Sequence, residues 1–163
     1  MSCSSNDDEI DDNKEGGKSS IELYINDVKQ KVSENNNQAA PIVYDDGLTF
    51  YIYYNGGSGD GFWMNFDGVS LDNLKVGDNL ITKSTKYDYQ LEFENNHYWL
   101  LKAYTQMSQF KDYQGQALVT EYDKSNKILK VEFTNLKLPL FKGVNPSNEK
   151  VATVKCIIKY KIE

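Results

Sequence analysis

Residues 87–104 read YDYQLEFENNHYWLLKAY and carry the clearest structural pattern of the chain. Hydrophobic side chains occupy every second position from 87 to 93, and acidic or amide side chains occupy the positions between them. Because side chains alternate between the two faces of a strand, this period predicts a strand with one buried face and one wet face. Asn95 and Asn96 are turn-forming residues that lead into a second hydrophobic run over 98–104. The stretch therefore predicts an antiparallel β-hairpin.

Similar short runs recur along the whole chain, separated by turn-type pairs such as Asn26-Asp27. The predicted strands are residues 21–26, 28–32, 41–44, 48–54, 62–66, 87–93, 98–104, 116–122, 127–133 and 151–162. We find no run with the apolar stripe of a three-turn helix. About nine to ten short strands with regular turns predict an all-β fold, an antiparallel β-sandwich. The alternative is a lipocalin-like or other closed barrel.

The hydrophobic positions change phase near residue 135. They are odd-numbered up to Phe133 and even-numbered from Leu136 onward. A phase change of one residue inside a strand predicts a β-bulge or a bend between two sheets. The following segment, residues 142–150, contains Gly143 and Pro146 and is predicted to be a loop.

The N-terminal segment differs from the rest of the chain in composition. Six acidic residues lie between Asp7 and Glu15, and two glycines follow them. Like charges repel one another, and the segment has too little apolar surface to order itself. The sequence therefore predicts a flexible acidic tether over residues 1–18 and a single β-sandwich domain over residues 19–163.

The residues around Cys3 resemble those of a known class of protein. Ser2 is a small residue before Cys3, and the run Ser4-Ser5-Asn6-Asp7-Asp8-Glu9 follows it. This pattern resembles Bacteroidota lipoproteins, in which an acidic stretch after the lipidated Cys is associated with export to the outer cell surface. The resemblance implies a signal peptide ahead of this numbering and a lipid anchor on Cys3. It also implies an outer-membrane location on the cell surface, with the periplasmic face as the alternative.

A second segment carries a related resemblance. Residues 119–133 are similar to a hairpin near the C-terminus of small β-rich Bacteroidota lipoproteins of uncharacterised families, although Lys130-Val131 stands where that pattern often has Gly. Those families have no assigned chemistry, so the resemblance implies a fold and a location and names no activity.

Charge and composition narrow the range of partners. The formal net charge is −6, whereas nucleic-acid binding requires a basic face. All 18 basic residues are Lys, so the planar Arg fork that recognises phosphate and carboxylate in bidentate fashion is missing from the sequence. We therefore expect no nucleic-acid partner and no dedicated phosphate site. No apolar run is long enough to span a membrane.

Nucleophilic catalysis and zinc binding find little support in the sequence. His97 is the only His, and we interpret it as a turn residue of the hairpin. Cys156 alternates with hydrophobic residues in the last predicted strand and is interpreted as a buried small hydrophobe. A catalytic triad and a zinc site each need more of these groups than the chain offers.

Paired carboxylates and calcium remain open in the sequence. A glycoside hydrolase needs two facing acids, and the candidate acids on wet strand faces are Glu92, Glu94, Glu121 and Glu132. Solubility explains such residues equally well. Calcium would take oxygen ligands from loops, with Asp45, Asp46 and Asp60 as weak candidates, alongside Asp67 and Asp78. Asp-Gly pairs are also common hairpin turns, so we expect no cofactor and keep calcium as the alternative.

The aromatic content is the strongest indication of function. The chain has 12 Tyr, 7 Phe and 2 Trp. Strand alternation places Trp63 on the strand face opposite to its hydrophobic neighbours, and it places Trp99 in the same way. Tyr51 and Tyr53 share one strand face. If these four residues met on an exposed face, they would form a flat platform for a sugar ring. The competing interpretation is that both sheet faces are covered and the rings belong to the core or to cross-strand pairs.

These observations favour a non-catalytic cell-surface lipoprotein that binds an extracellular glycan. Two alternatives stay open. One is a protein-partner or assembly subunit of a surface complex, which would exchange an edge strand such as 151–162. The other is a glycoside hydrolase-type accessory enzyme, which would show two facing acids in a cleft.

Overall fold

The computed structural model describes residues 19–32, 42–44, 47–55 and 60–161. The tether prediction for residues 1–18, the lipid attachment at Cys3 and the calcium candidates Asp45 and Asp46 fall outside these residues. No helix among the described residues is long and apolar enough to cross a membrane.

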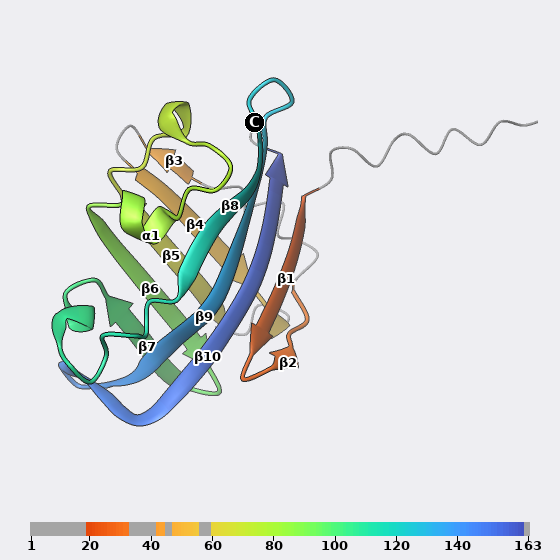
Figure 1. The fold of residues 1–163 in the computed structure, drawn as a ribbon. Helices are drawn as coiled ribbons and strands as arrows, with labels where there is room; N and C mark the ends of the chain where they lie inside the picture. The colour runs from red at the N-terminus through yellow and green to blue at the C-terminus, as the bar shows by residue number, and fades with distance from the viewer. Residues whose placement is uncertain (1–18, 33–41, 45–46, 56–59, 162–163) are drawn as a thin grey trace, which may run out of the picture.

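The described part of the chain is an all-β fold of ten antiparallel strands, as predicted (Figure 1). The strands are β1 Ser20–Ile25, β2 Val28–Lys29, β3 Ile42–Tyr44, β4 Gly47–Tyr53, β5 Gly61–Asp67, β6 Lys86–Phe93, β7 Asn96–Leu101, β8 Gln116–Asp123, β9 Ile128–Lys142 and β10 Asn145–Lys161. Their order is β2-β1-β10-β9-β7-β6-β5-β4-β3, and β8 pairs with β9 off this path. The sheet is not closed into a barrel, so the sandwich prediction holds and the barrel alternative does not.

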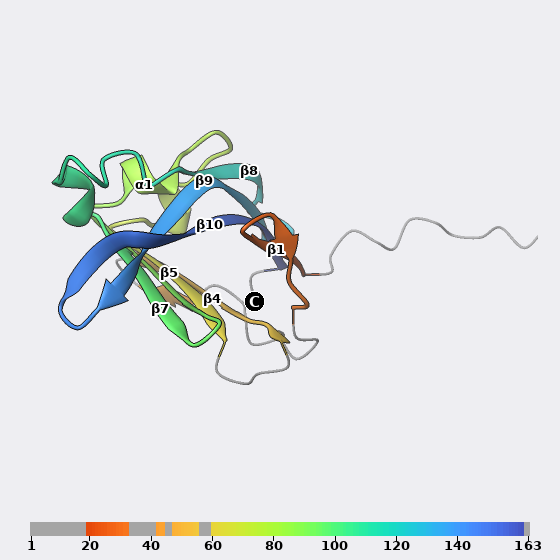
Figure 2. The ribbon, with the colours of Figure 1, turned by 90° about the horizontal axis from the view of Figure 1, so that it is seen from below.

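Strand β9 joins the two layers of the sandwich. Its first half pairs with β8 over Ile128 to Thr134, whereas its second half reaches β7 through the pair Tyr98 and Leu140. One layer thus contains β8, β10 and β1, and the other contains β4–β7 (Figure 2). Among the described residues, an isolated bridge between Val32 and Tyr54 also links the segment after β2 to the end of β4.

The switch between layers occurs at the predicted phase change. Asn135 has φ +55°, and the register of β9 against β10 shifts between Val154 and Cys156 at the same level. Phe133 and Leu136 are both buried although they are three positions apart. The bulge therefore turns both halves of β9 toward the same core, which confirms the interpretation of the phase change.

The core lies between the layers and is rich in aromatic residues. The Phe50 ring centroid lies 6.1 Å from that of Phe66, 6.0 Å from that of Phe133 and 6.1 Å from that of Tyr160. These four rings come from β4, β5, β9 and β10, so they tie the two layers together. Cys156 is fully buried among them as a free thiol, and burial raises its pKa. Its predicted role as a small hydrophobe is confirmed.

Two local predictions are wrong. Residues 145–150 belong to β10, so the predicted loop over 142–150 is a tight turn at Gly143, which has φ +63°. Pro146 pairs with Phe141 in extended backbone, and the pairing of β9 with β10 becomes irregular one residue later, between Ser147 and Val151. In the hairpin of residues 87–104, β7 ends at Leu101, and Tyr104 begins the 3-10 turn η4 Tyr104–Gln106.

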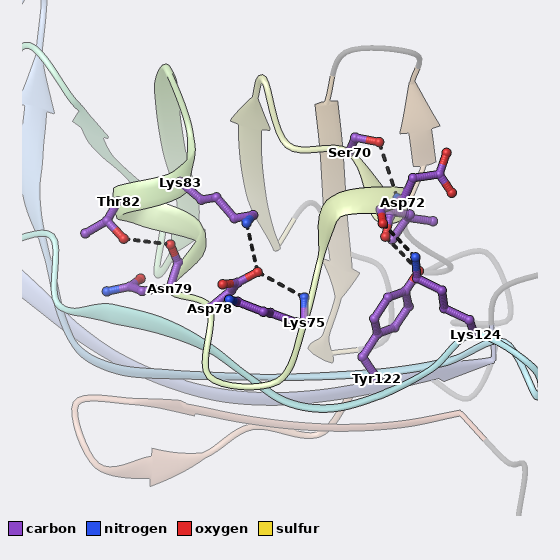
Figure 3. Close-up of polar contacts among 10 residues, drawn as sticks. Ser70, Asp72, Lys75, Asp78, Asn79, Thr82, Lys83, Tyr122 and Lys124 are labelled. Atoms are coloured by element: carbon purple, nitrogen blue, oxygen red, sulfur yellow. Dashed lines mark hydrogen bonds and ion pairs between the residues drawn. The ribbon is translucent and has the colours of Figure 1, made fainter.

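The segment between β5 and β6 is held against β8 by polar contacts (Figure 3). It contains the short helices η3 Leu71–Asn73 and α1 Leu80–Lys83. Tyr122 Oη donates to the Leu71 carbonyl at 2.9 Å, and Lys124 Nζ donates to the Asp72 carbonyl at 2.6 Å. Backbone bonds from Gly77 N to Val119 O and from Val119 N to Asp78 O, both 2.9 Å, occupy the outer edge of β8. This edge is therefore covered by the chain itself.

Candidate functional site

The four predicted platform residues lie on one face of the sheet, the outer surface of β4–β7, which we call the aromatic face. Three rows cross all four strands: Thr49, Asn65, Asp88 and Leu101; then Tyr51, Trp63, Gln90 and Trp99; then Tyr53, Gly61, Glu92 and His97. An end row beside the first holds Gly47, Asp67 and Lys86. Tyr53 is 40% exposed, and Tyr51, Trp63 and Trp99 are half-buried. Neither Trp belongs to the buried core, so the interpretation as core residues is wrong. The other half of that interpretation, cross-strand ring pairs, holds for Trp63, which pairs with Tyr51.

Tyr51, Tyr53 and Trp63 form one aromatic cluster of this face. The Tyr51 ring centroid lies 3.9 Å from that of Tyr53 and 4.7 Å from that of Trp63. Gly61, opposite Tyr53 in the register, lies beneath these rings. A Cβ there would come within 3.0 Å of Tyr51 Oη and 3.1 Å of Trp63 Cη2. The missing side chain of Gly61 therefore lets the two rings lie close to the sheet. Burial and a hydrogen bond with Tyr53 raise the pKa of Tyr51, which keeps its hydroxyl neutral.

Trp99 lies at the centre of a second cluster. Its ring centroid is 4.9 Å from that of Phe141, 6.0 Å from that of His97 and 6.4 Å from that of Tyr104. The indole Nε1 donates a hydrogen bond to Asp88 Oδ1, which fixes the orientation of the ring. Strand alternation would place Tyr104 on the opposite face of the sheet from Trp99. The two rings nevertheless lie close together, because β7 ends at Leu101, before Tyr104.

Polar side chains occupy the surface between the two clusters. Gln90 stands directly between Trp63 and Trp99 in the register, and its Nε2 donates to Asp88 Oδ2 at 3.0 Å. Next to this pair, Thr49 Oγ1 donates to Asn65 Oδ1 at 2.8 Å. One end of each amide therefore has no hydrogen bond to another described residue. These groups are the Nδ2 donor of Asn65 and the Oε1 acceptor of Gln90. The face therefore offers hydrogen-bonding groups of fixed orientation beside flat rings.

His97 is part of strand β7, so its interpretation as a turn residue is wrong. The turn consists of Glu94 and Asn95, with φ +50° and +59°, and His97 pairs with Glu92 across the ladder. Its Nδ1 contacts Glu92 Oε1, and its ring lies 5.9 Å from that of Phe141. The pair forms one margin of the aromatic face.

The outer surface of the other layer has a different character. It carries ion pairs: Lys159 Nζ of β10 lies 3.0 Å from Glu121 Oε2 of β8, and Lys130 Nζ lies 2.9 Å from Glu132 Oε1 within β9. Tyr24, a half-buried aromatic residue of this surface, has a lysine on either side: Lys29 and Lys155, with Nζ at 5.7 and 5.9 Å from the ring centroid. In contrast, the aromatic face has one Lys, Lys86, which lies at its end opposite Asp67. The two surfaces of one sandwich are therefore chemically distinct.

The other sequence-predicted site residues do not come together. Asp60 Oδ2 accepts from Asn55 Nδ2 at 3.2 Å, and Asp78 bonds the backbone of its own turn. Asp67 ends β5. Among the described residues, we find no group of three His, Cys, Asp or Glu side chains that could hold a metal ion.

The acidic residues show pKa shifts in one direction. The carboxyl groups with a shifted pKa are Asp78, Asp123, Glu132 and Glu149, and in each the pKa is lowered by hydrogen bonds. The partners are Lys83 for Asp78, Asn126 for Asp123, Lys130 for Glu132 and Lys142 for Glu149. A general acid for glycoside hydrolysis needs a raised pKa, so none of these four fits that role.

Sequence reasoning missed several members of the aromatic face. The wet positions of the 87–93 strand include Asp88 and Gln90, and the hairpin register would have placed Gln90 beside Trp99. No sequence pattern indicated that Phe141 belongs to this face. Its position beside Trp99 depends on the bulge at Asn135 and on the pairing of β9 with β7, which are far apart in sequence. Gly61 belonged to a predicted flexible connection and is instead the first residue of β5.

We compared the chain with models of protein families, with curated proteins and with solved structures. None of the three comparisons found a match.

Proposed function

We propose that this protein is a non-catalytic glycan-binding module whose binding surface is the aromatic face. The observation that carries the proposal is the arrangement of Trp63, Trp99, Tyr51 and Tyr53 on one half-exposed surface, separated by amide and carboxylate groups. Sugar rings present apolar C–H faces and hydroxyl edges. Flat aromatic rings suit the former, and oriented amides and carboxylates suit the latter.

Two further features support a binding role. The polar side chains of the face are already held by hydrogen bonds within the described residues, so little side-chain entropy is lost when a ligand binds. The carboxyl groups with a shifted pKa, among them Glu132 and Glu149, have it lowered, so none of them supplies the raised pKa that a general acid needs.

Thermal unfolding of the whole chain against soluble glycans tests the proposal. A ligand that binds only the folded protein raises the unfolding midpoint. We expect a rise with at least one of β-glucan, mannan, xylan or starch, and we expect Trp63→Ala and Trp99→Ala each to remove most of it. Running the series with calcium and with a chelator tests the calcium alternative at Asp60.

Tyr24→Ala is the matched control, because it removes a half-buried aromatic residue from the other outer surface. It should leave the ligand-induced rise unchanged. A rise that persists in both Trp variants would refute this binding surface, and no rise with any glycan would refute the function.

We further propose that the module is anchored to the outer membrane by lipid on Cys3 and faces the cell surface. Support comes from the sequence pattern around Cys3. Mass spectrometry of the protein from its own cells should show acyl chains on the N-terminal peptide, and Cys3→Ser should move the protein from the membrane fraction to the soluble fraction. An unmodified Cys3 in membrane-purified protein would contradict this location.

A further inference from the structure

We infer that the aromatic face takes an extended, uncharged glycan chain that lies across the strands, rather than a single sugar or an acidic polysaccharide. This inference rests on the proposed function and deepens it. Three observations carry it: the direction of the central row, the shape of the face and its charge.

The central row fixes a direction and a length. Tyr51, Trp63, Gln90 and Trp99 occupy matching register positions on four neighbouring strands. Strands lie about 4.8 Å apart, so the three intervals of this row span about 14 Å. A single sugar ring covers only part of that distance. A chain lying along the row can place one ring on Trp63, another on Trp99 and the linkage between them over Gln90.

The face is a surface rather than a pocket. Its three rows come from the same side of four strands, and neither of two cavities lined by described residues includes a residue of these rows. An open surface contacts one side of a chain and leaves both chain ends free to continue. Such a site favours the interior of a polymer over its terminus.

The charge of the face disfavours acidic chains. Asp88 lies in the first row and Glu92 in the third, on either side of the central row, whereas the one Lys of the face, Lys86, lies in the end row opposite a further carboxylate, Asp67. Uronate or sulfate groups on a chain along the central row would lie close to both carboxylates. Like charges repel, and Lys86 lies beyond Asp88, away from the central row, with Asp67 as its register partner. A neutral chain avoids this repulsion and can donate its hydroxyls to the carboxylate oxygens.

Calorimetric titration of the whole protein tests the inference with defined probes. The neutral probes are cello-, malto- and xylo-oligosaccharides from monosaccharide to hexasaccharide, together with mannan. The acidic probes are polygalacturonate and alginate. We expect affinity for one neutral series to rise several-fold with chain length and to level off once the row is filled. Added salt should leave this affinity unchanged.

Acidic probes should bind several-fold more weakly than the neutral chain, and added salt should reduce this difference in affinity. Glu92→Gln should reduce the difference in affinity further. Glu132→Gln makes the same chemical change on the other outer surface and should leave the difference as it is. Equal affinity for monosaccharide and hexasaccharide, or tighter binding of acidic chains at low salt, would overturn this inference and leave the proposed function standing. If no probe binds, neutral or acidic, the proposed function itself fails.

Discussion

At the scale of single residues, two glycines show how backbone space determines what a substitution does. A Cβ on Gly115, which has φ +57°, would lie 2.2 Å from the Thr134 carbonyl oxygen. A Cβ on Gly61 would meet only the ends of two side chains, Tyr51 and Trp63. Backbone cannot move aside at small cost, whereas side-chain ends can. The first glycine therefore supports the fold, and the second shapes the aromatic face.

Gly61→Ala should fold and yet bind glycan more weakly, because the added methyl group pushes the Tyr51 and Trp63 rings away from the sheet. We expect an unfolding midpoint within a few degrees of the parent and a several-fold loss of affinity. Gly115→Ala is the comparison and should lower the free energy of unfolding by about 2 kcal/mol or more. Unchanged glycan affinity in Gly61→Ala would show that ring placement does not matter.

Asp78 makes a pH-dependent contribution to stability. Lys83 Nζ lies 2.9 Å from Asp78 Oδ2, and the Lys75 amide donates to the same oxygen at 3.0 Å. These contacts lower the pKa of Asp78 from its ordinary 3.8. Because the folded-state pKa lies below the unfolded one, the stabilisation is present above pH 3.8 and is lost as the pH falls through the lowered value.

Asp78→Asn should therefore lower the free energy of unfolding by about 1 kcal/mol at neutral pH, a modest effect because water screens the pair. The difference from the parent should shrink as the pH falls below 3.8. Urea unfolding of both proteins across this pH range measures it. A difference that stays constant with pH would mean that the charge of Asp78 makes no contribution.

At the scale of elements, β9 shows what the sequence could and could not predict. The parity change between Phe133 and Leu136 is visible in the sequence and predicts the bulge. The partner of the first half of β9 is visible as well, because β8 is local in sequence and forms a hairpin with it. The partner of the second half, β7, is distant in sequence and is not visible. The same limit applies to the site: alternation placed Trp63 and Trp99 on outward positions, but only the strand order β7-β6-β5-β4 places both on one surface.

The loop predicted over 142–150 failed for a related reason. Gly and Pro are local turn signals, but pairing with β9 extends β10 through Pro146. Likewise, His97 follows turn-forming residues and still belongs to β7, because the two turn residues are Glu94 and Asn95. Tertiary pairing decides the ends of strands when local signals are close together.

The bulge predicts a substitution pattern at Asn135, whose side chain is exposed and whose φ is +55°. Asn tolerates this conformation, Gly adopts it readily and a β-branched residue does not. We expect Asn135→Val to lower the free energy of unfolding by about 1–2 kcal/mol. Asn135→Gly should leave it unchanged or slightly higher. Chemical denaturation measures both.

Lys137→Val is the control for this pair, since it places the same residue at an exposed position of the same strand where φ is not positive. Its effect should stay within about 0.5 kcal/mol. If Val is tolerated equally at both positions, the bulge does not hold residue 135 in the left-handed conformation.

At the scale of the whole molecule, the sandwich has two outer surfaces of different composition. One carries Lys and Glu side chains that pair within and across strands, as expected for a solvated surface. The other carries both Trp residues of the chain, with amides between them and a single Lys, Lys86, at its end. The core needs neither Trp, since Phe and Tyr rings already join the two layers. We attribute the aromatic face to ligand binding for this reason.

Both Trp residues lie on the aromatic face, so intrinsic tryptophan emission reports on this surface alone. The measurement that tests the central claim most directly is a fluorescence titration of the whole protein with the neutral glycan that raises its unfolding midpoint. We predict a saturable change in emission with the affinity found by calorimetry, reduced in part in Trp63→Phe and in part in Trp99→Phe. Glycan binding detected by calorimetry with no change in emission would place the ligand elsewhere and contradict the account.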